Sequence, residues 1–278
     1  MLKRRYVLAL AAGGAVALRV GIGPAAAGRT RIGGTGAALG LMKRLCDVFC
    51  DANEVRAPGT PFEIVPATGS AGGIAAVIDG VLDLGVSGRP LSAQEAARGA
   101  REMFMGATPF VFATSHPNPE SLTRADVIAI YAGTRRIWAD GTPIKLILRP
   151  RSDGDPLILI RHIEGLEPAM EAARRRAELP VMATDQRNTQ LARQLPGSFV
   201  GAALAQLLVE EGGLQIVPLD GLVPGIDHLA SGAYVMAKPF YCITGPRPSS
   251  AAVDFLAFLR SDEAGRIMRS TGVLPAAH

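Results

Sequence analysis

Cysteine and histidine are scarce in this chain, which limits the chemistry that it can perform. Its 278 residues include three cysteines and four histidines. Three cysteines are too few for a disulfide framework, and none forms a Cys-x-x-Cys pair of the kind that binds metal ions. Cys46 and Cys50 are expected to share one helix face, where disulfide geometry is seldom met. We therefore predict that these two cysteines and Cys242 are buried free thiols.

Catalytic and cofactor motifs are also missing. None of the histidines lies in a metal-ligand spacing or beside a serine or cysteine motif. The run Gly69-Ser70-Ala71-Gly72 lacks the Gly-x-Ser-x-Gly form of a nucleophile turn. The run Gly33-Gly34-Thr35-Gly36 lacks the third glycine of a dinucleotide-binding fingerprint. The sequence predicts no metal site and no cofactor, and it favours a binding protein over an enzyme.

The excess of basic residues is confined to the beginning of the chain. Lysine and arginine number 29 against 25 aspartates and glutamates, and four of the basic residues precede Gly28. The remainder is formally neutral. Because nucleic-acid-binding proteins carry a basic patch or stripe, we expect no nucleic acid among the partners.

The first residues have the three parts of a secretory signal. Residues 1–6 include the basic run Lys3-Arg4-Arg5, residues 7–18 carry no charge, and Ala25-Ala26-Ala27 forms a small-residue cleavage site. We expect a signal peptide over residues 1–27 and export to the periplasm. The apolar part is well below the roughly 20 residues that span a membrane, which disfavours a permanent anchor. Arg4-Arg5 also loosely resembles a twin-arginine signal, but every such leader has basic residues, so the export route stays open.

Strand, glycine-rich turn and helix recur as a unit along the rest of the chain. A strand at 31–32 leads through Gly33–Gly36 into helical spacing from Leu39 to Phe49, and a strand at 62–65 leads through 68–72 into another helix. Further strands are expected at 82–86 and 145–149, and further helices from Ser92 and Thr123, where capping-box patterns begin. Repeated strand and helix units predict an α/β fold with mostly parallel sheets.

Two apolar strands far apart in sequence are candidates for crossings between two lobes. They lie at 110–113 and 240–244. The predicted organisation is a discontinuous first lobe, residues 28–113 and 238–278, and a second lobe, residues 114–237. No low-complexity segment or long linker divides this pattern.

The turns between these strands and helices are suited to binding anions. The first N–H groups of a helix have no partner within it, and the helix dipole adds partial positive charge there. In open parallel sheets such turns gather at the carboxyl ends of the strands, where ligands bind. Four turns qualify: Gly33–Ala38, Thr68–Gly73, Ser87–Arg89 and Arg149–Pro156.

Several motifs, in order, give the chain a resemblance to a known family. They are the runs 67–74 and 80–87, the segment 122–133 followed by Trp138 and Gly141, Arg149 at a strand end, the segments 230–234 and 238–241, and finally 272–275. This order is similar to that of the phosphate ABC transporter substrate-binding proteins. The resemblance implies a two-lobed venus-flytrap fold, the type II periplasmic binding protein fold, with two hinge crossings, which closes on its anion between the lobes.

The resemblance also implies a set of ligand-binding residues. Ser70 falls on the family's binding serine, and Arg149 on its arginine, which grips an oxyanion with a forked pair of hydrogen bonds. The whole expected set is Thr35, Gly36, Ala37, Ala38, Gly69, Ser70, Ala71, Ser87, Gly88, Arg149, Ser152, Asp153 and Gly154.

The expected site also departs from the family. The family's first-loop threonine falls on Ala38, and the aspartate that accepts a hydrogen bond from a protonated phosphate falls on Gly88. Without that acceptor, the site loses its means of preferring a protonated oxyanion. Asp155 is expected to cap a helix and face away; the alternative is that Asp153 supplies the missing acceptor from the second lobe.

Two functions remain open at this stage. The first is a monomeric extracytoplasmic solute-binding protein that captures phosphate or a related oxyanion for an ABC permease in the inner membrane. The second is a sensor or scaffold that keeps this fold but no longer binds phosphate. The losses at Ala38 and Gly88, together with the acidic pair Asp153 and Asp155, motivate the second.

Overall fold

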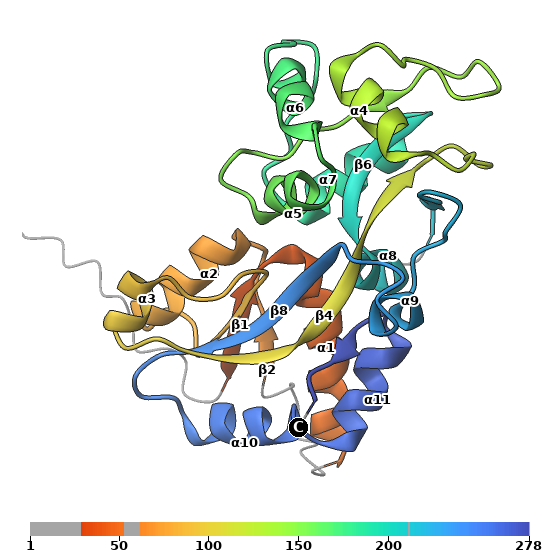
Figure 1. The fold of residues 1–278 in the computed structure, drawn as a ribbon. Helices are drawn as coiled ribbons and strands as arrows, with labels where there is room; N and C mark the ends of the chain where they lie inside the picture. The colour runs from red at the N-terminus through yellow and green to blue at the C-terminus, as the bar shows by residue number, and fades with distance from the viewer. Residues whose placement is uncertain (1–28, 53–61, 211, 278) are drawn as a thin grey trace, which may run out of the picture.

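The computed structural model describes residues 29–52, 62–210 and 212–277 (Figure 1). The predicted signal peptide lies outside the described residues. The strands are β1 Thr30–Gly34, β2 Phe62–Ile64, β3 Leu84–Ser87, β4 Arg101–Thr114, β5 Lys145–Leu146, β6 Ser198–Ala203, β7 Gln215–Val217, β8 Ala237–Thr244 and β9 Leu274–Pro275. The helices are α1 Gly36–Ala52, α2 Gly69–Ile78, α3 Ala93–Ala97, α4 Arg124–Ala132, α5 Gly154–His162, α6 Leu166–Arg174, α7 Asp185–Gln194, α8 Leu204–Val209, α9 Ile226–Ala230, α10 Ser250–Phe258 and α11 Asp262–Ser270. Within these ranges, no helix has the length and apolar character needed to cross a membrane.

One path of paired strands runs through the molecule in the order β2-β1-β3-β8-β4-β6-β5. β1 is parallel to β2 and β3, and β5 is parallel to β6. The expectation of mostly parallel sheets needs correction, because β8 is antiparallel to β3 and β4, and β4 is antiparallel to β6, β7 and β9. The parallel units lie at the two ends of the path, where the strand and helix repeat predicted them.

The long strands β4 and β8 join the two halves of the molecule, as Figure 1 shows. The first part of β4 pairs with β8, and from Phe110 onward it pairs with β6 and β7. At this change the Phe110 amide donates to the Met236 carbonyl at 2.9 Å. Both strands therefore pass between the halves at one place, in agreement with the predicted hinge crossings. β4 carries the chain from the first half to the second and β8 carries it back, so these two strands run antiparallel to each other.

Each half has its own apolar core, and the fold is α/β and two-lobed. One core combines α1, β3, β8, α10 and α11 around side chains such as Leu45 and Phe255. The other combines β4, α4, α6 and β6 around side chains such as Trp138 and Phe199. Helix α8 lies inside the sequence range predicted for the second lobe, yet Ala205 belongs to the first core. The predicted lobe boundaries stay a prediction.

Local sequence signals position several elements as expected. Ser92 and Thr123 form capping boxes at the starts of α3 and α4, and Gly133 ends α4 in the left-handed conformation.

Cys46, Cys50 and Cys242 are free and buried, as predicted. Burial raises the pKa of Cys242 to about 12, so this thiol stays protonated.

Candidate functional site

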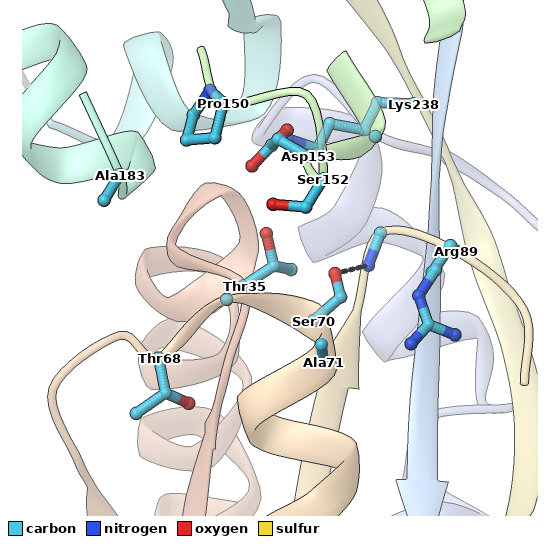
Figure 2. A pocket seen from close by; sticks show the side chains of 13 residues that line it. Thr35, Thr68, Ser70, Ala71, Arg89, Pro150, Ser152, Asp153, Ala183 and Lys238 are labelled. Carbon is cyan, nitrogen blue, oxygen red and sulfur yellow. Dashed lines mark hydrogen bonds between the residues drawn. The ribbon is translucent and has the colours of Figure 1, made fainter. Parts of the chain in front are cut away.

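A cleft of about 160 Å³ lies where the two halves face each other (Figure 2). Strand carboxyl ends meet there from both sides, since β1 and β3 end in lining turns on one side and the loop after β5 lines the other. In Figure 2, Thr35 and Ser70 lie on one side and Ser152 and Asp153 on the other. The lining residues are Thr35, Thr68, Gly69, Ser70, Ala71, Gly88, Arg89, Pro150, Ser152, Asp153, Gly154, Ala183 and Lys238.

The expected site residues divide into two groups. Eight of them line the cleft: Thr35, Gly69, Ser70, Ala71, Gly88, Ser152, Asp153 and Gly154. Five are not among the lining residues: Gly36, Ala37, Ala38, Ser87 and Arg149. The Ser87 hydroxyl makes a hydrogen bond within its own turn, donating to the Arg89 carbonyl at 2.6 Å. The structure therefore brings together turns that are separated by more than one hundred residues.

The N-terminus of α2 supplies hydrogen-bond donors to the cleft. Thr68 occupies the N-cap position, but its side chain accepts no capping hydrogen bond, so the first amides of α2 are not satisfied by it. The Ser70 oxygen accepts from the Gly88 amide at 2.8 Å, which leaves the Ser70 hydroxyl hydrogen to donate elsewhere. α2 approaches β1 closely, because a Cβ on Gly73 would lie 2.6 Å from the Gly34 Cα.

Asp153 begins α5 and faces the cleft. Its Oδ1 accepts from the Asp155 amide at 2.9 Å, and its Oδ2 accepts from Arg149 Nη2 at 2.5 Å. The expected capping role of Asp155 is therefore wrong: Asp153 is the N-cap, and Asp155 is buried. Asp153 presents a carboxylate to the cleft, as the alternative required.

Arg149 does not point into the cleft. Its guanidinium is buried and lies against Asp153, Asp155 and Asp185, with Nη1 donating to the Met182 carbonyl at 2.7 Å. Burial lowers the pKa of Arg149, but the three carboxylates outweigh it and the net shift is upward. The expected fork of Arg149 on an oxyanion stays a prediction; in this structure the guanidinium is paired with carboxylates of the protein.

Lys238 lines the cleft and was not assigned to the site by the sequence analysis. It is 4% exposed, at the start of β8, and its Nζ lies 2.6 Å from Asp155 Oδ1 and 3.0 Å from Asp185 Oδ1. A Cβ on Gly88 would come within 3.1 Å of the Lys238 Cε, so the glycine makes room for the lysine. The sequence offered one signal for Lys238: it is a single lysine near the start of an otherwise apolar strand. A lysine buried in such a strand needs a carboxylate partner.

Asp185 was also missed, and it makes contacts with both halves. Its Oδ2 accepts from the Thr35 hydroxyl and the Ala37 amide, each at 3.1 Å. Its Oδ1 accepts from Lys238 at 3.0 Å. Burial acts to raise the pKa of Asp185, but Lys238 and Arg149 together with the hydrogen bonds lower it to about 2. No local sequence signal identifies this residue, because its partners lie 148 and 150 residues away.

The charged cluster at the cleft contains two cations and three carboxylates, of which Lys238 and Asp153 line the cleft. Arg149 and Lys238 face Asp153, Asp155 and Asp185. Burial raises the pKa of Asp155 to about 6, and Lys238 offsets only part of that rise. Arg89, on the edge of the cleft, is paired with Glu95 at 2.7 Å. In the described part of the chain, no group of three or more His, Cys, Asp or Glu side chains is placed to hold a metal ion.

Comparisons with known proteins agree with this architecture. Residues 22–263 match the family model of the PBP superfamily domain, and no curated protein matches the sequence. A phosphate ABC transporter substrate-binding protein with bound phosphate from Clostridium perfringens has a similar structure, with a TM-score of 0.73 and 17% identity over 90% of this chain and 100% of that chain.

Two further solved structures share the fold. A phosphate-binding protein from Stenotrophomonas maltophilia has a TM-score of 0.66 and 11% identity, covering 90% of this chain and 91% of that chain. An ABC-type phosphate transport receptor from Vibrio cholerae has a TM-score of 0.57 and 17% identity, covering 88% and 99%. The names of these three solved proteins describe them as binding or transport-receptor proteins. Since the family model covers most of the chain, this protein belongs to the periplasmic binding protein (PBP) superfamily.

Proposed function

We propose that the protein is an extracytoplasmic solute-binding protein that captures phosphate or a related oxyanion in the cleft and delivers it to an ABC importer. The observation that carries this proposal is the convergence of eight expected site residues, from both halves of the molecule, on one small cavity. A volume of about 160 Å³ suits a small polyatomic ion. The names of the similar solved structures support the same ligand class.

Hydrogen-bond donors rather than free cations would hold the anion. The Ser70 hydroxyl and the first amides of α2 face the cavity from one side, and Ser152 faces it from the other. Helix N-termini bind anions through such amides without a lysine. Because Asp153 also lines the cavity, a protonated oxyanion can donate its hydrogen to that carboxylate.

Delivery to a permease requires export, which the proposal assigns to the leader at residues 1–27. Mass spectrometry of the protein recovered from the periplasm tests this step. A mature chain beginning at Gly28 is the expected result, and an intact leader in that fraction would contradict it. Deletion of the gene should also reduce phosphate uptake, and unchanged uptake would argue against the importer role.

Calorimetric titration of residues 28–278 with phosphate tests the binding function. We expect saturable heat from the wild type and an affinity about tenfold weaker or more for Ser70→Ala, since a hydrogen bond to a charged ligand is lost. Ser231→Ala is the matched control, because Ser231 is exposed and makes only a local bond to the His228 carbonyl. No heat from the wild type, or equal effects of the two substitutions, would contradict the proposal.

A second function, a sensor or scaffold that does not bind phosphate, is favoured by one observation. Three carboxylates surround the two cations of the charged cluster at the cleft. Isolation of the protein from envelope membranes decides between the two. A stable, phosphate-free complex with a receptor would support the second function, whereas phosphate-dependent association with a permease would support the first.

A further inference from the structure

The turn after β1 holds a carboxylate that belongs to the protein itself. Thr35 and Ala37 form the beginning of α1, a 17-residue helix, and both donate to Asp185 Oδ2 at 3.1 Å. This is one of the four turns expected to bind an anion. The position is therefore filled by a side chain from the N-terminus of α7.

The surroundings of Asp185 are those of a bound anion rather than of a surface ion pair. The residue is 5% exposed, and Lys238 is 4% exposed. Donors reach its two oxygens from separate segments: the β1–α1 turn, β8 through Lys238 at 3.0 Å, and the loop after β5 through Arg149 at 3.4 Å. A buried carboxylate with this many donors has its charge fully compensated.

The next residue adds a second contact between the same two segments. Gln186 Nε2 donates to the Gly36 carbonyl at 2.9 Å. A Cβ on Gly36 would lie 1.9 Å from Gln186 Oε1, so only glycine permits this approach. The first two residues of α7 are thus seated together on the β1–α1 turn.

We propose that Asp185 is a resident anion that sets the specificity of the cleft. It occupies the anion position formed by Thr35, Ala37, Lys238 and Arg149, and it leaves an incoming solute only the part lined by Ser70 and Ser152.

The resident charge decides which solutes the remaining cavity accepts. Because Asp153, Asp155 and Asp185 outnumber Arg149 and Lys238 by one, no unpaired cation of this cluster is left for a solute, and each further negative charge on the solute adds repulsion. The cleft should accept an oxyanion with a single negative charge and discriminate against a doubly charged one of the same shape. This part of the inference rests on the proposed function.

Chemical rescue tests the resident anion without relying on any cleft ligand. Asp185→Ala should be destabilised, and sodium formate should raise its melting temperature by about 2–4 °C relative to sodium chloride of equal ionic strength. The wild type should not respond, because its position is filled. Adding Thr35→Val to Asp185→Ala should reduce the formate effect, since one donor is lost. Equal responses of the wild type and Asp185→Ala would overturn the proposal.

Selectivity between sulfate and phosphate tests the role in specificity. At a pH below the second ionisation of phosphate, sulfate carries two charges and phosphate carries one. The wild type should prefer phosphate, and Asp185→Asn, which keeps the shape of the side chain, should reduce that preference by about tenfold or more. Binding by the wild type with an unchanged ratio in Asp185→Asn would overturn the specificity role alone. If neither protein bound either anion, the proposed function would fail, and formate rescue would still decide the resident position.

Discussion

Lys238 supplies one of the two cations of the charged cluster at the cleft and pairs with two of its carboxylates. Its ammonium is the nearest cation to both Asp155 and Asp185. Burial acts to lower the pKa of Lys238, but the two carboxylates raise it above its ordinary value, so the side chain is charged at neutral pH. Removal of one member of a buried ion pair leaves an uncompensated charge, which costs far more than the loss of an exposed pair.

Replacement of Lys238 by methionine should therefore destabilise the protein strongly. We expect Lys238→Met to lower the free energy of unfolding by about 3–5 kcal/mol, measured by urea denaturation at neutral pH. Lys43→Met is the control, since Lys43 pairs with Asp47 on the surface of α1 and should cost less than about 1 kcal/mol. Equal costs for the two variants would show that the buried cluster does not need its cation.

Asp155 should make stability fall as the pH rises. Its pKa is raised from 3.8 to about 6 by burial, so the folded state binds the proton more tightly than the unfolded state. The contribution to stability is fully present below the unfolded value of 3.8 and is lost as the pH rises through about 6. This loss amounts to about 3 kcal/mol. The difference in free energy of unfolding between the wild type and Asp155→Asn should decline across this window, and a difference that grows with pH would refute the assignment.

For individual residues, the sequence predicts site positions that belong to a local turn motif. It misses contacts between side chains that are far apart in the chain. Ser70 and Gly88 were placed on the cleft because each belongs to a turn with a recognisable pattern. Arg149 was expected to face a ligand, but Asp185, 36 residues away, lies against its guanidinium. No periodicity or turn signal reports such a pairing, because the tertiary fold alone creates it.

Helix α2 is the element that brings amide donors to the cleft, and its backbone packs closely against the end of β1. Two glycines make this possible. Gly69 begins the helix with a φ of 74°, and Gly73 packs against Gly34. Without a side chain at Gly73, the helix backbone can lie directly on the strand end.

A methyl group at Gly73 should displace α2. Alanine in a helix interior normally stabilises by about 0.5–1 kcal/mol relative to glycine. At Gly73 the added Cβ would lie 2.6 Å from the Gly34 Cα, so Gly73→Ala should instead cost about 1–3 kcal/mol and weaken phosphate binding. Gly265→Ala in α11 is the matched control, because its nearest neighbour would be at 3.9 Å and stabilisation is expected. Thermal melting and calorimetry measure both effects, and stabilisation by Gly73→Ala would contradict the close packing.

Elements with local signals were predicted well, whereas strand directions were not. The capping boxes at Ser92 and Thr123 start helices as expected. The antiparallel neighbours of β4 and β8 could not be predicted from the strand and helix repeat. Their pairing joins Arg101 to Thr244, and such distant registers leave no trace in periodicity.

In the molecule as a whole, hydrogen bonds and ion pairs of the chain itself join the two halves across the cleft. Asp185 and Gln186 bind the turn at residues 35–37, and Lys238 links β8 to the acidic cluster. Binding proteins of this kind close by a hinge motion around the ligand. Here part of the closing contact is built from the chain itself.

Solution scattering should detect this built-in contact. The wild type should show little change in radius of gyration when phosphate is added. The double variant Asp185→Ala/Gln186→Ala should be more expanded without phosphate and contract when it is added, because the hinge is released. Identical scattering from the two proteins would show that these contacts do not hold the halves together.

Binding of an oxyanion in the cleft beside the Asp185 carboxylate is tested most directly by a crystal structure of the mature protein grown with arsenate. Arsenate is a phosphate analogue whose arsenic is located by anomalous scattering. We expect an arsenic peak in the cleft between Ser70 and Ser152, with Asp185 still hydrogen-bonded to Thr35 and Ala37. A cleft without the peak, or arsenate in the place of the Asp185 carboxylate, would contradict it.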